Sequence, residues 1–216
     1  MNMPQLATAT TAARTLSQRV RRTLIDAAAV HAAMAETAPL TVPQARVPRA
    51  PALMADAQPG SAAAREERRA LYVRCLAHYR RVMAAGASVQ KQPQPQGDDI
   101  GIAAAHFVAA NLRAVQGLEV TPEQFEALHR QLAGVLRVGL SLLPEREQQI
   151  YFEKFALLAV LVSETWTLAL RQGPAAMANV RQAARGYLIE LLSLEPEQLM
   201  LGAQGLVLRE AVACAA

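Results

Sequence analysis

The stretch that decides the fold is PEREQQIYFEKFALLAVLVSETWTLALR, residues 144–171. Pro144 with acidic residues in the turn behind it is a helix-start signal. Proline has no backbone N–H that would lack a partner at the start of a helix. Acidic side chains in the first turn are stabilised by the positive end of the helix dipole. Gly173 and Pro174 mark the end of the helix, because this residue order does not easily continue it.

Apolar residues recur at helical spacing along this stretch, and a second apolar row covers much of the other side. A helix that is apolar nearly all round belongs in the middle of a bundle. About 28 residues give a helix of about 42 Å, long enough to be the spine of a small domain. The first row is Tyr151, Phe155, Leu158, Val162, Trp166 and Ala169.

Composition favours helices throughout the chain. Of its 216 residues, 52% are hydrophobic but only 4% are aromatic, so alanine, leucine and valine must form the core. Such small side chains suit closely packed helices more than a sheet, and no stretch has a convincing strand period. We therefore predict an all-α, up-and-down helical bundle around residues 144–171, with an N-terminal helix attached by a proline-rich strap.

The chain divides into five predicted parts. Residues 1–37 form a basic amphipathic helix, 38–60 a proline-rich linker or strap and 61–85 an arginine-rich helix. A glutamine- and proline-rich linker at 86–97 leads into the bundle domain, 98–216. Helix starts are expected at Ser61, at Asp98 or Asp99, at the Thr121 capping box, at Pro174 and at Pro196, and a helix end at Gly117.

Charge differs between the two ends of the chain. Residues 1–85 hold twelve arginines and five acidic residues, a net charge of +7, against −3 for residues 86–216. This asymmetry indicates either a polyanion-binding arm or a solvated basic face, and the second is the commoner case. The candidate interaction surface consists of Arg14, Arg21, Arg22, Arg65, Arg68, Arg69, Arg80 and Arg81.

One set of residues resembles a metal site. Glu126 and His129 have the Glu-x-x-His spacing that di-iron bundles use twice, and Glu153 could face them. The unit occurs once here, so a structural salt bridge from Glu153 to Arg113, Arg130 or Arg137 is the commoner arrangement. The sequence lacks a P-loop, a dinucleotide fingerprint, zinc spacing and G-x-S-x-G. We therefore expect no catalytic residues, no cofactor, no metal and no small-molecule substrate.

Two further features bear on the setting of the chain. Cys75 and Cys214 are too few and too distant to indicate a disulfide framework, which leaves their redox state open. The N-terminus has no apolar region typical of an export signal, which favours the cytoplasm, and no segment is apolar for long enough to predict a membrane span.

Residues 98–208 resemble a bacterial all-helical family of unknown function. The motifs that carry the resemblance are AAAHFVAAN before Gly117, TPEQFEALHRQL, REQQIYFEKFALL and LEPEQLMLGAQGL. The resemblance implies a helical domain whose recurring residues are structural, and an envelope or periplasmic setting.

We expect a non-catalytic protein–protein interaction or scaffold protein, including a subunit of an envelope or secretion-related assembly. Its partner would be another protein or a second copy of the chain, and its N-terminal helix and strap would dock on that partner. The alternative is a polyanion binder, for nucleic acid or an anionic membrane surface, acting through the arginine-rich helices.

Overall fold

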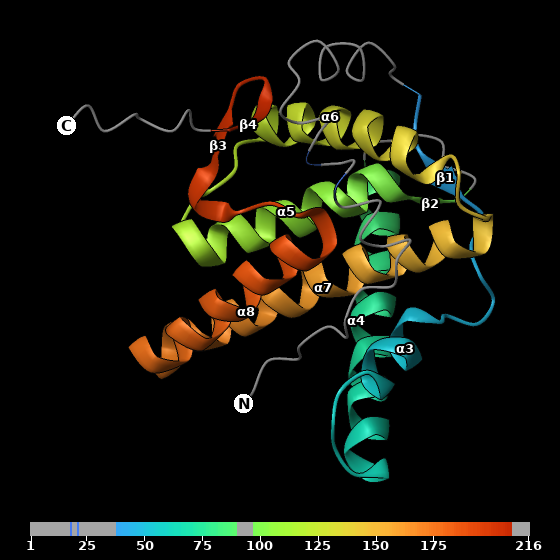
Figure 1. Ribbon diagram of the computed structural model, residues 1–216, viewed down its shortest axis with the longest axis vertical. Helices are drawn as coiled ribbons and strands as arrows, with labels where there is room; N and C mark the ends of the chain where they lie inside the picture. The colour runs from blue at the N-terminus through green and yellow to red at the C-terminus, as the bar shows by residue number, and fades with distance from the viewer. Residues whose placement is uncertain (1–17, 19–20, 22–37, 90–96, 209–216) are drawn as a thin grey trace.

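The computed structural model describes residues 18, 21, 38–89 and 97–208 (Figure 1). Most of the predicted helix at 1–37, with Arg14 and Arg22, lies outside these ranges, as does Cys214. So does most of the predicted linker at 86–97. Gln18 and Arg21 are helical and exposed. The structure is mostly helical, which confirms the predicted all-α bundle.

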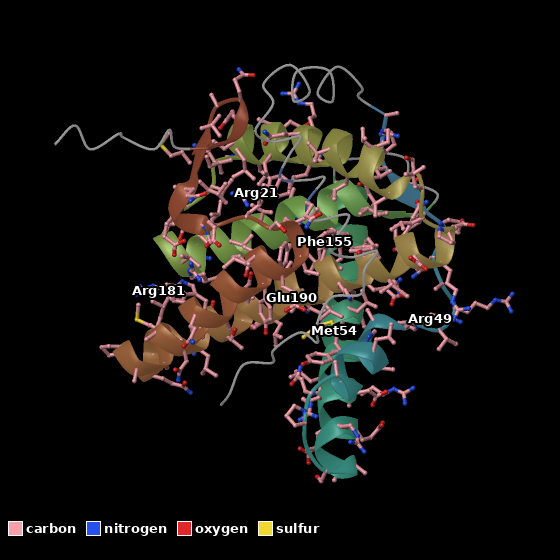
Figure 2. The ribbon with its side chains drawn as sticks, viewed as in Figure 1. Arg21, Arg49, Met54, Phe155, Arg181 and Glu190 are labelled. Carbon is pink, nitrogen blue, oxygen red and sulfur yellow. The ribbon has the colours of Figure 1, made fainter. Side chains whose placement is uncertain are left out.

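The central helix is α7, Glu145–Gln172. It packs against α3, α4, α5 and α8, and its Phe155 is fully buried near the middle of the bundle (Figure 2). The predicted start is one residue early, because Pro144 is the residue before the helix rather than its first turn. Gly173 ends the helix at φ +100°, a conformation that favours glycine.

Three other helices complete the body of the bundle: α5, Ile100–Gln116, α6, Pro122–Leu140, and α8, Pro174–Leu192. Their predicted ends are confirmed. Asp99 caps α5 by accepting a 3.0 Å bond from the amide of Ile102, and Gly117 ends it at φ +70°. Thr121 and Gln124 form a reciprocal capping box, which satisfies two amides that the first turn of α6 leaves free.

The N-terminal elements share the core with this body. The helix α4, Ala62–Val89, is longer than the predicted 61–85, and its first half projects from the bundle beside α3 (Figure 1). The short helix α3, Ala50–Asp56, lies in the strap that we expected to be extended. Buried residues from Leu40 to Leu206 form one hydrophobic cluster, so α3 and α4 are integral to the folded unit.

The described residues include two pairs of short strands, and we predicted neither of them. The strand β1, Thr41–Val42, pairs antiparallel with β2, Asp98–Asp99, and thereby fixes the strap at the start of α5. After the 3₁₀ turn η1, Pro196–Gln198, the strands β3, Leu199–Gly202, and β4, Gly205–Leu208, form a hairpin against α6. The predicted helix at Pro196 is thus a single 3₁₀ turn.

Glutamine side chains replace a third strand on both edges of the hairpin. Gln131 of α6 is 1% exposed. It donates to the carbonyl of Leu206 at 2.8 Å and accepts from the amide of Leu206 at 2.6 Å. On β3, Gln116 donates to the carbonyl of Leu199 and Gln124 to that of Leu201. These amides satisfy backbone groups that an edge strand would otherwise expose.

Candidate functional site

The candidate site is a groove with a volume of about 540 Å³, which we call the α4–α7 groove. One wall is α4 and the other is the α5–α6 loop with the start of α6, while α5 and α7 form the bottom. Its apolar lining consists of Tyr79, Val82, Met83, His106, Ala109, Ala110, Leu118, Val120, Pro122, Phe125, Ala159 and Val160. The volume lies in the range of sites that accommodate a small ligand or a few side chains of a partner.

Aromatic rings form one end of the groove. The hydroxyl of Tyr79 lies 3.1 Å from Nδ1 of His106, and their rings meet edge to face at 5.6 Å. The ring of Phe125 lies 4.6 Å from that of His106. Tyr79 also contacts Phe152 of α7 edge to face, at 6.1 Å. The cluster therefore ties α4, α5, α6 and α7 together at this site.

These aromatic groups carry no charge at neutral pH. Burial lowers the pKa of His106 to about 4, and hydrogen bonding to the carbonyl of Ile102 only partly opposes this effect. Burial likewise raises the pKa of Tyr79 well above its ordinary value of 10.0. The aromatic end of the groove is therefore a neutral, apolar surface, which favours binding of apolar side chains over charged groups.

Charged residues stand at the rim. Arg113 and Glu119 form a 2.9 Å ion pair with both side chains largely exposed. Glu164 of α7 is exposed and forms no ion pair with another described residue. Val82 of α4 is 54% exposed, so an apolar side chain on the α4 wall is open to solvent. The rim can select a partner by charge, while the interior supplies apolar contact.

The three residues that were weighed as a metal site, Glu126, His129 and Glu153, do not converge. His129 lies 4.0 Å from Glu126 and 3.9 Å from Asp99, whereas Glu153 bonds to a different part of the chain. In the described ranges, no group of three or more His, Cys, Asp or Glu side chains is placed to hold a metal ion.

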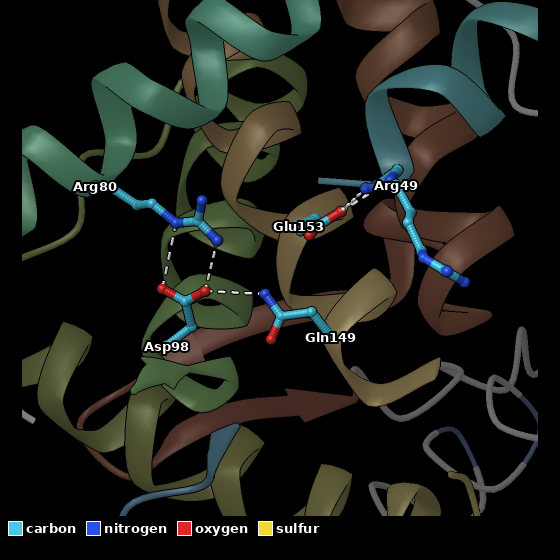
Figure 3. Close-up of polar contacts among 6 residues, drawn as sticks. Arg49, Arg80, Asp98, Gln149 and Glu153 are labelled. Carbon is cyan, nitrogen blue, oxygen red and sulfur yellow. Dashed lines mark hydrogen bonds and ion pairs between the residues drawn. The ribbon is translucent and has the colours of Figure 1, made fainter. Parts of the chain in front are cut away.

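Glu153 is fully buried and caps α3 from a distance (Figure 3). Its Oε2 accepts the amides of Arg49 and Ala50, both at 2.8 Å, where α3 has no capping side chain of its own. Burial raises the pKa of Glu153, and the bond from Ala50 opposes this shift. The predicted salt bridge to an arginine is therefore wrong, and the role of Glu153 is to hold the strap.

Arg113, Arg130 and Arg137, the three predicted partners of Glu153, lie elsewhere. Arg113 pairs with Glu119 and Arg130 with Glu126, while Arg137 donates to the carbonyl of Ala38.

The neighbouring buried polar group is Asp98 (Figure 3). It receives Arg80 of α4 through two bonds, the shorter at 2.6 Å, and Gln149 of α7 at 2.9 Å. Because Arg80 follows Tyr79, this ion pair positions the α4 wall of the groove. Arg80 therefore has a structural role within the fold, and its guanidinium is not available to bind a partner.

The remaining predicted arginines are divided between packing and solvent. Arg68 folds back onto the carbonyls of Ala55, Gln58 and Pro59. Arg65 bonds to the carbonyl of Gly60, and Arg69 pairs loosely with Glu66. Arg21 and Arg81 are exposed, as is Arg74, which the prediction omitted. Whether the exposed members bind a partner stays a prediction.

Lys154 occupies a second polar position in the core. Its ammonium lies 5.9 Å from the centre of the Tyr151 ring, and burial lowers its pKa. Glu190 of α8, labelled in Figure 2, is half-buried, and burial raises its pKa to about 7 while Lys154 lowers it.

The groove itself was not predicted. Its aromatic contact joins Tyr79 of α4 to His106 of α5, two residues that are 27 positions apart in the chain. The spacing of residues within one helix does not predict contacts between helices, so nothing in the sequence indicated that the rings of Tyr79 and His106 meet.

Comparison with known proteins gives one match. The model of a family described as a family of unknown function, DUF6683, matches residues 2–209, well beyond the 98–208 of the predicted resemblance. No curated protein and no solved structure matches the chain. Among the described helices, none is long and apolar enough to cross a membrane.

Proposed function

The chain belongs to DUF6683, a family of unknown function, and we propose that it is a non-catalytic protein-interaction module. The α4–α7 groove receives an apolar helical segment of a partner protein. The observation that carries this proposal is the apolar groove itself, open to solvent, with uncharged aromatic rings at one end and Val82 exposed on its wall. Helix-in-groove recognition uses this combination of features.

The contacts that hold the α4 wall of the groove in place support the proposed binding function. The Arg80–Asp98 ion pair and the aromatic contacts of Tyr79 hold α4 against the bundle. A preorganised groove loses little conformational entropy on binding, so apolar contact converts more fully into affinity.

The polyanion alternative has less support from the described residues. It requires clustered, available arginines, but Arg68 and Arg80 are bonded within the fold. Salt separates the two functions: polyanion binding weakens steeply with salt, and apolar binding does not. The expected envelope or secretion-related setting rests on the family resemblance alone.

The test uses the full chain and an uncharged amphipathic peptide of alanine, leucine and glutamine, with leucine at helical i, i+3, i+4 and i+7 positions. We expect binding by fluorescence anisotropy, and hydrogen-exchange protection at residues 78–83 and 118–125. Val82→Asp should weaken binding about tenfold, because it places a charge at an apolar contact.

The matched control is Val138→Asp, since Val138 on α6 is 58% exposed and does not line the groove. Equal affinity of the two variants, or protection elsewhere in the chain, would show that the groove is not the binding site. Binding that disappears with added salt would support the polyanion alternative instead.

A further inference from the structure

The face of α7 beside the groove carries two unpaired charges of opposite sign. Glu164 and Arg171 are exposed, and neither forms an ion pair with another described residue. They are seven residues apart, so they lie about 10.5 Å apart along the same side of the helix. With Val160 and Thr167 they form what we call the α7 stripe. The stripe begins in the groove, where Val160 and Glu164 line it.

This charge pattern is self-complementary. If two α7 helices lie antiparallel about a two-fold axis between Thr167 and Leu168, each Glu164 faces Arg171 of the other copy. Two identical ion pairs then form at once, as in an isologous dimer. Exposed Leu168 and Leu170, at 45% and 52%, flank the stripe and would be covered in such a pair.

The same axis decides what enters the groove. It places Gln172, the last residue of α7 in the second copy, opposite Ser163, which lines the groove, so the α7–α8 corner that follows Gln172 lies next to the groove. The segment Pro174–Met177 is PAAM, the first turn of α8, and it lies at the corner where α7 and α8 meet at one end of the molecule (Figure 1). The exposed side chains of this segment, Pro174 and Ala175, are apolar and small, so they fit a groove that is itself lined by alanines, whereas Ala176 and Met177 pack against the core of their own copy.

We propose that the α4–α7 groove receives the α7–α8 corner of a second copy of this chain, in a two-fold dimer held by reciprocal Glu164–Arg171 pairs. This inference rests on the proposed function and names its partner. The α7 stripe sets the register of the dimer, and the groove supplies the apolar contact. Arg113 and Glu119 pair with each other at the rim, which leaves Glu164 as the lining carboxylate that has no ion-pair partner among the described residues.

The test is the molar mass of the full chain by light scattering over a dilution series. We expect a dimer, with Glu164→Arg and Arg171→Glu each weakening it about tenfold by placing like charges opposite each other. The double variant Glu164→Arg/Arg171→Glu should restore the dimer, because it re-creates both pairs with reversed sign. Arg146→Glu, exposed in the first turn of α7, is the charge-matched control and should leave the dimer intact.

Several outcomes separate this inference from the proposed function. A chain that stays monomeric, or a double variant that fails to restore the dimer, overturns the two-fold pairing. Peptide binding in the groove would then still support the interaction module. A restored dimer whose residues 78–83 show no hydrogen-exchange protection overturns the placement of the corner in the groove. If Val82→Asp abolishes the dimer and Val138→Asp does not, the result supports both the groove as the binding site and the second copy as its occupant.

Discussion

Replacing Gln131 with methionine tests how the C-terminal hairpin is attached to the bundle. Methionine keeps the length and approximate volume of glutamine but removes both hydrogen bonds to Leu206. The site is buried, so neither backbone group of Leu206 gains water in exchange. Gln131→Met therefore isolates the contribution that the Gln131 side-chain amide makes to the free energy of unfolding when it bonds to Leu206 as a neighbouring strand would.

The magnitude follows from the two bonds. Each net hydrogen bond contributes about 1 kcal/mol, and a buried backbone group left without a partner costs about 1–3 kcal/mol. Partial relaxation of the hairpin limits the sum, so we expect a loss of about 2–4 kcal/mol in the free energy of unfolding. The hairpin backbone lies directly against this side chain, since a Cβ added at Gly205 would lie 2.5 Å from Oε1 of Gln131.

The assay is urea unfolding of the full chain, followed by far-ultraviolet circular dichroism, together with hydrogen exchange of residues 199–208. Gln182→Met is the control, since Gln182 is exposed on α8 and its replacement should change stability by less than about 0.5 kcal/mol. If Gln131→Met costs no more than this control, and the hairpin amides stay protected, the amide does not hold the hairpin.

Three further predictions concern the fold. Arg80→Met should lower the free energy of unfolding by about 2–4 kcal/mol in urea titrations, because it leaves the carboxylate of Asp98 buried with only its amide donor; an unchanged midpoint would contradict this. Stability should fall as pH drops from 6.5 towards about 4, because burial lowers the pKa of His106 to about 4 and the unfolded chain then binds the proton first. His106→Asn should reduce that slope in unfolding curves across this range. Gly117→Ala, at φ +70°, should lower the melting temperature at a cost of about 1 kcal/mol, whereas Gly186→Ala in mid-helix α8 should raise it, and shifts of the same sign would contradict the reasoning.

Local signals in the sequence were enough for most of the helices. The Thr121 capping box, the Asp99 cap and the left-handed Gly117 each act within one turn, so their physics is complete in a few adjacent residues. The α3 helix and the hairpin escaped detection for the opposite reason. The first depends on the carboxylate of Glu153, about a hundred residues away, and the second on Gln131.

The same division applies to the candidate site. The arginines that the sequence presents as one basic surface form two groups in the folded chain. Arg68 and Arg80 bond to acceptors within the fold that no helical period reveals, whereas others remain exposed. The groove likewise exists because α4 crosses α7 and brings Tyr79 to His106.

The sequence by itself therefore determined the helical class, the central position of α7 and most helix ends, because propensity, periodicity and capping are short-range. The tertiary structure alone decided which polar groups are buried partners, where the groove opens and which charges remain unpaired. These depend on distances between residues far apart in the chain, and the free energy of a buried charge or hydrogen bond is set by what lies across from it.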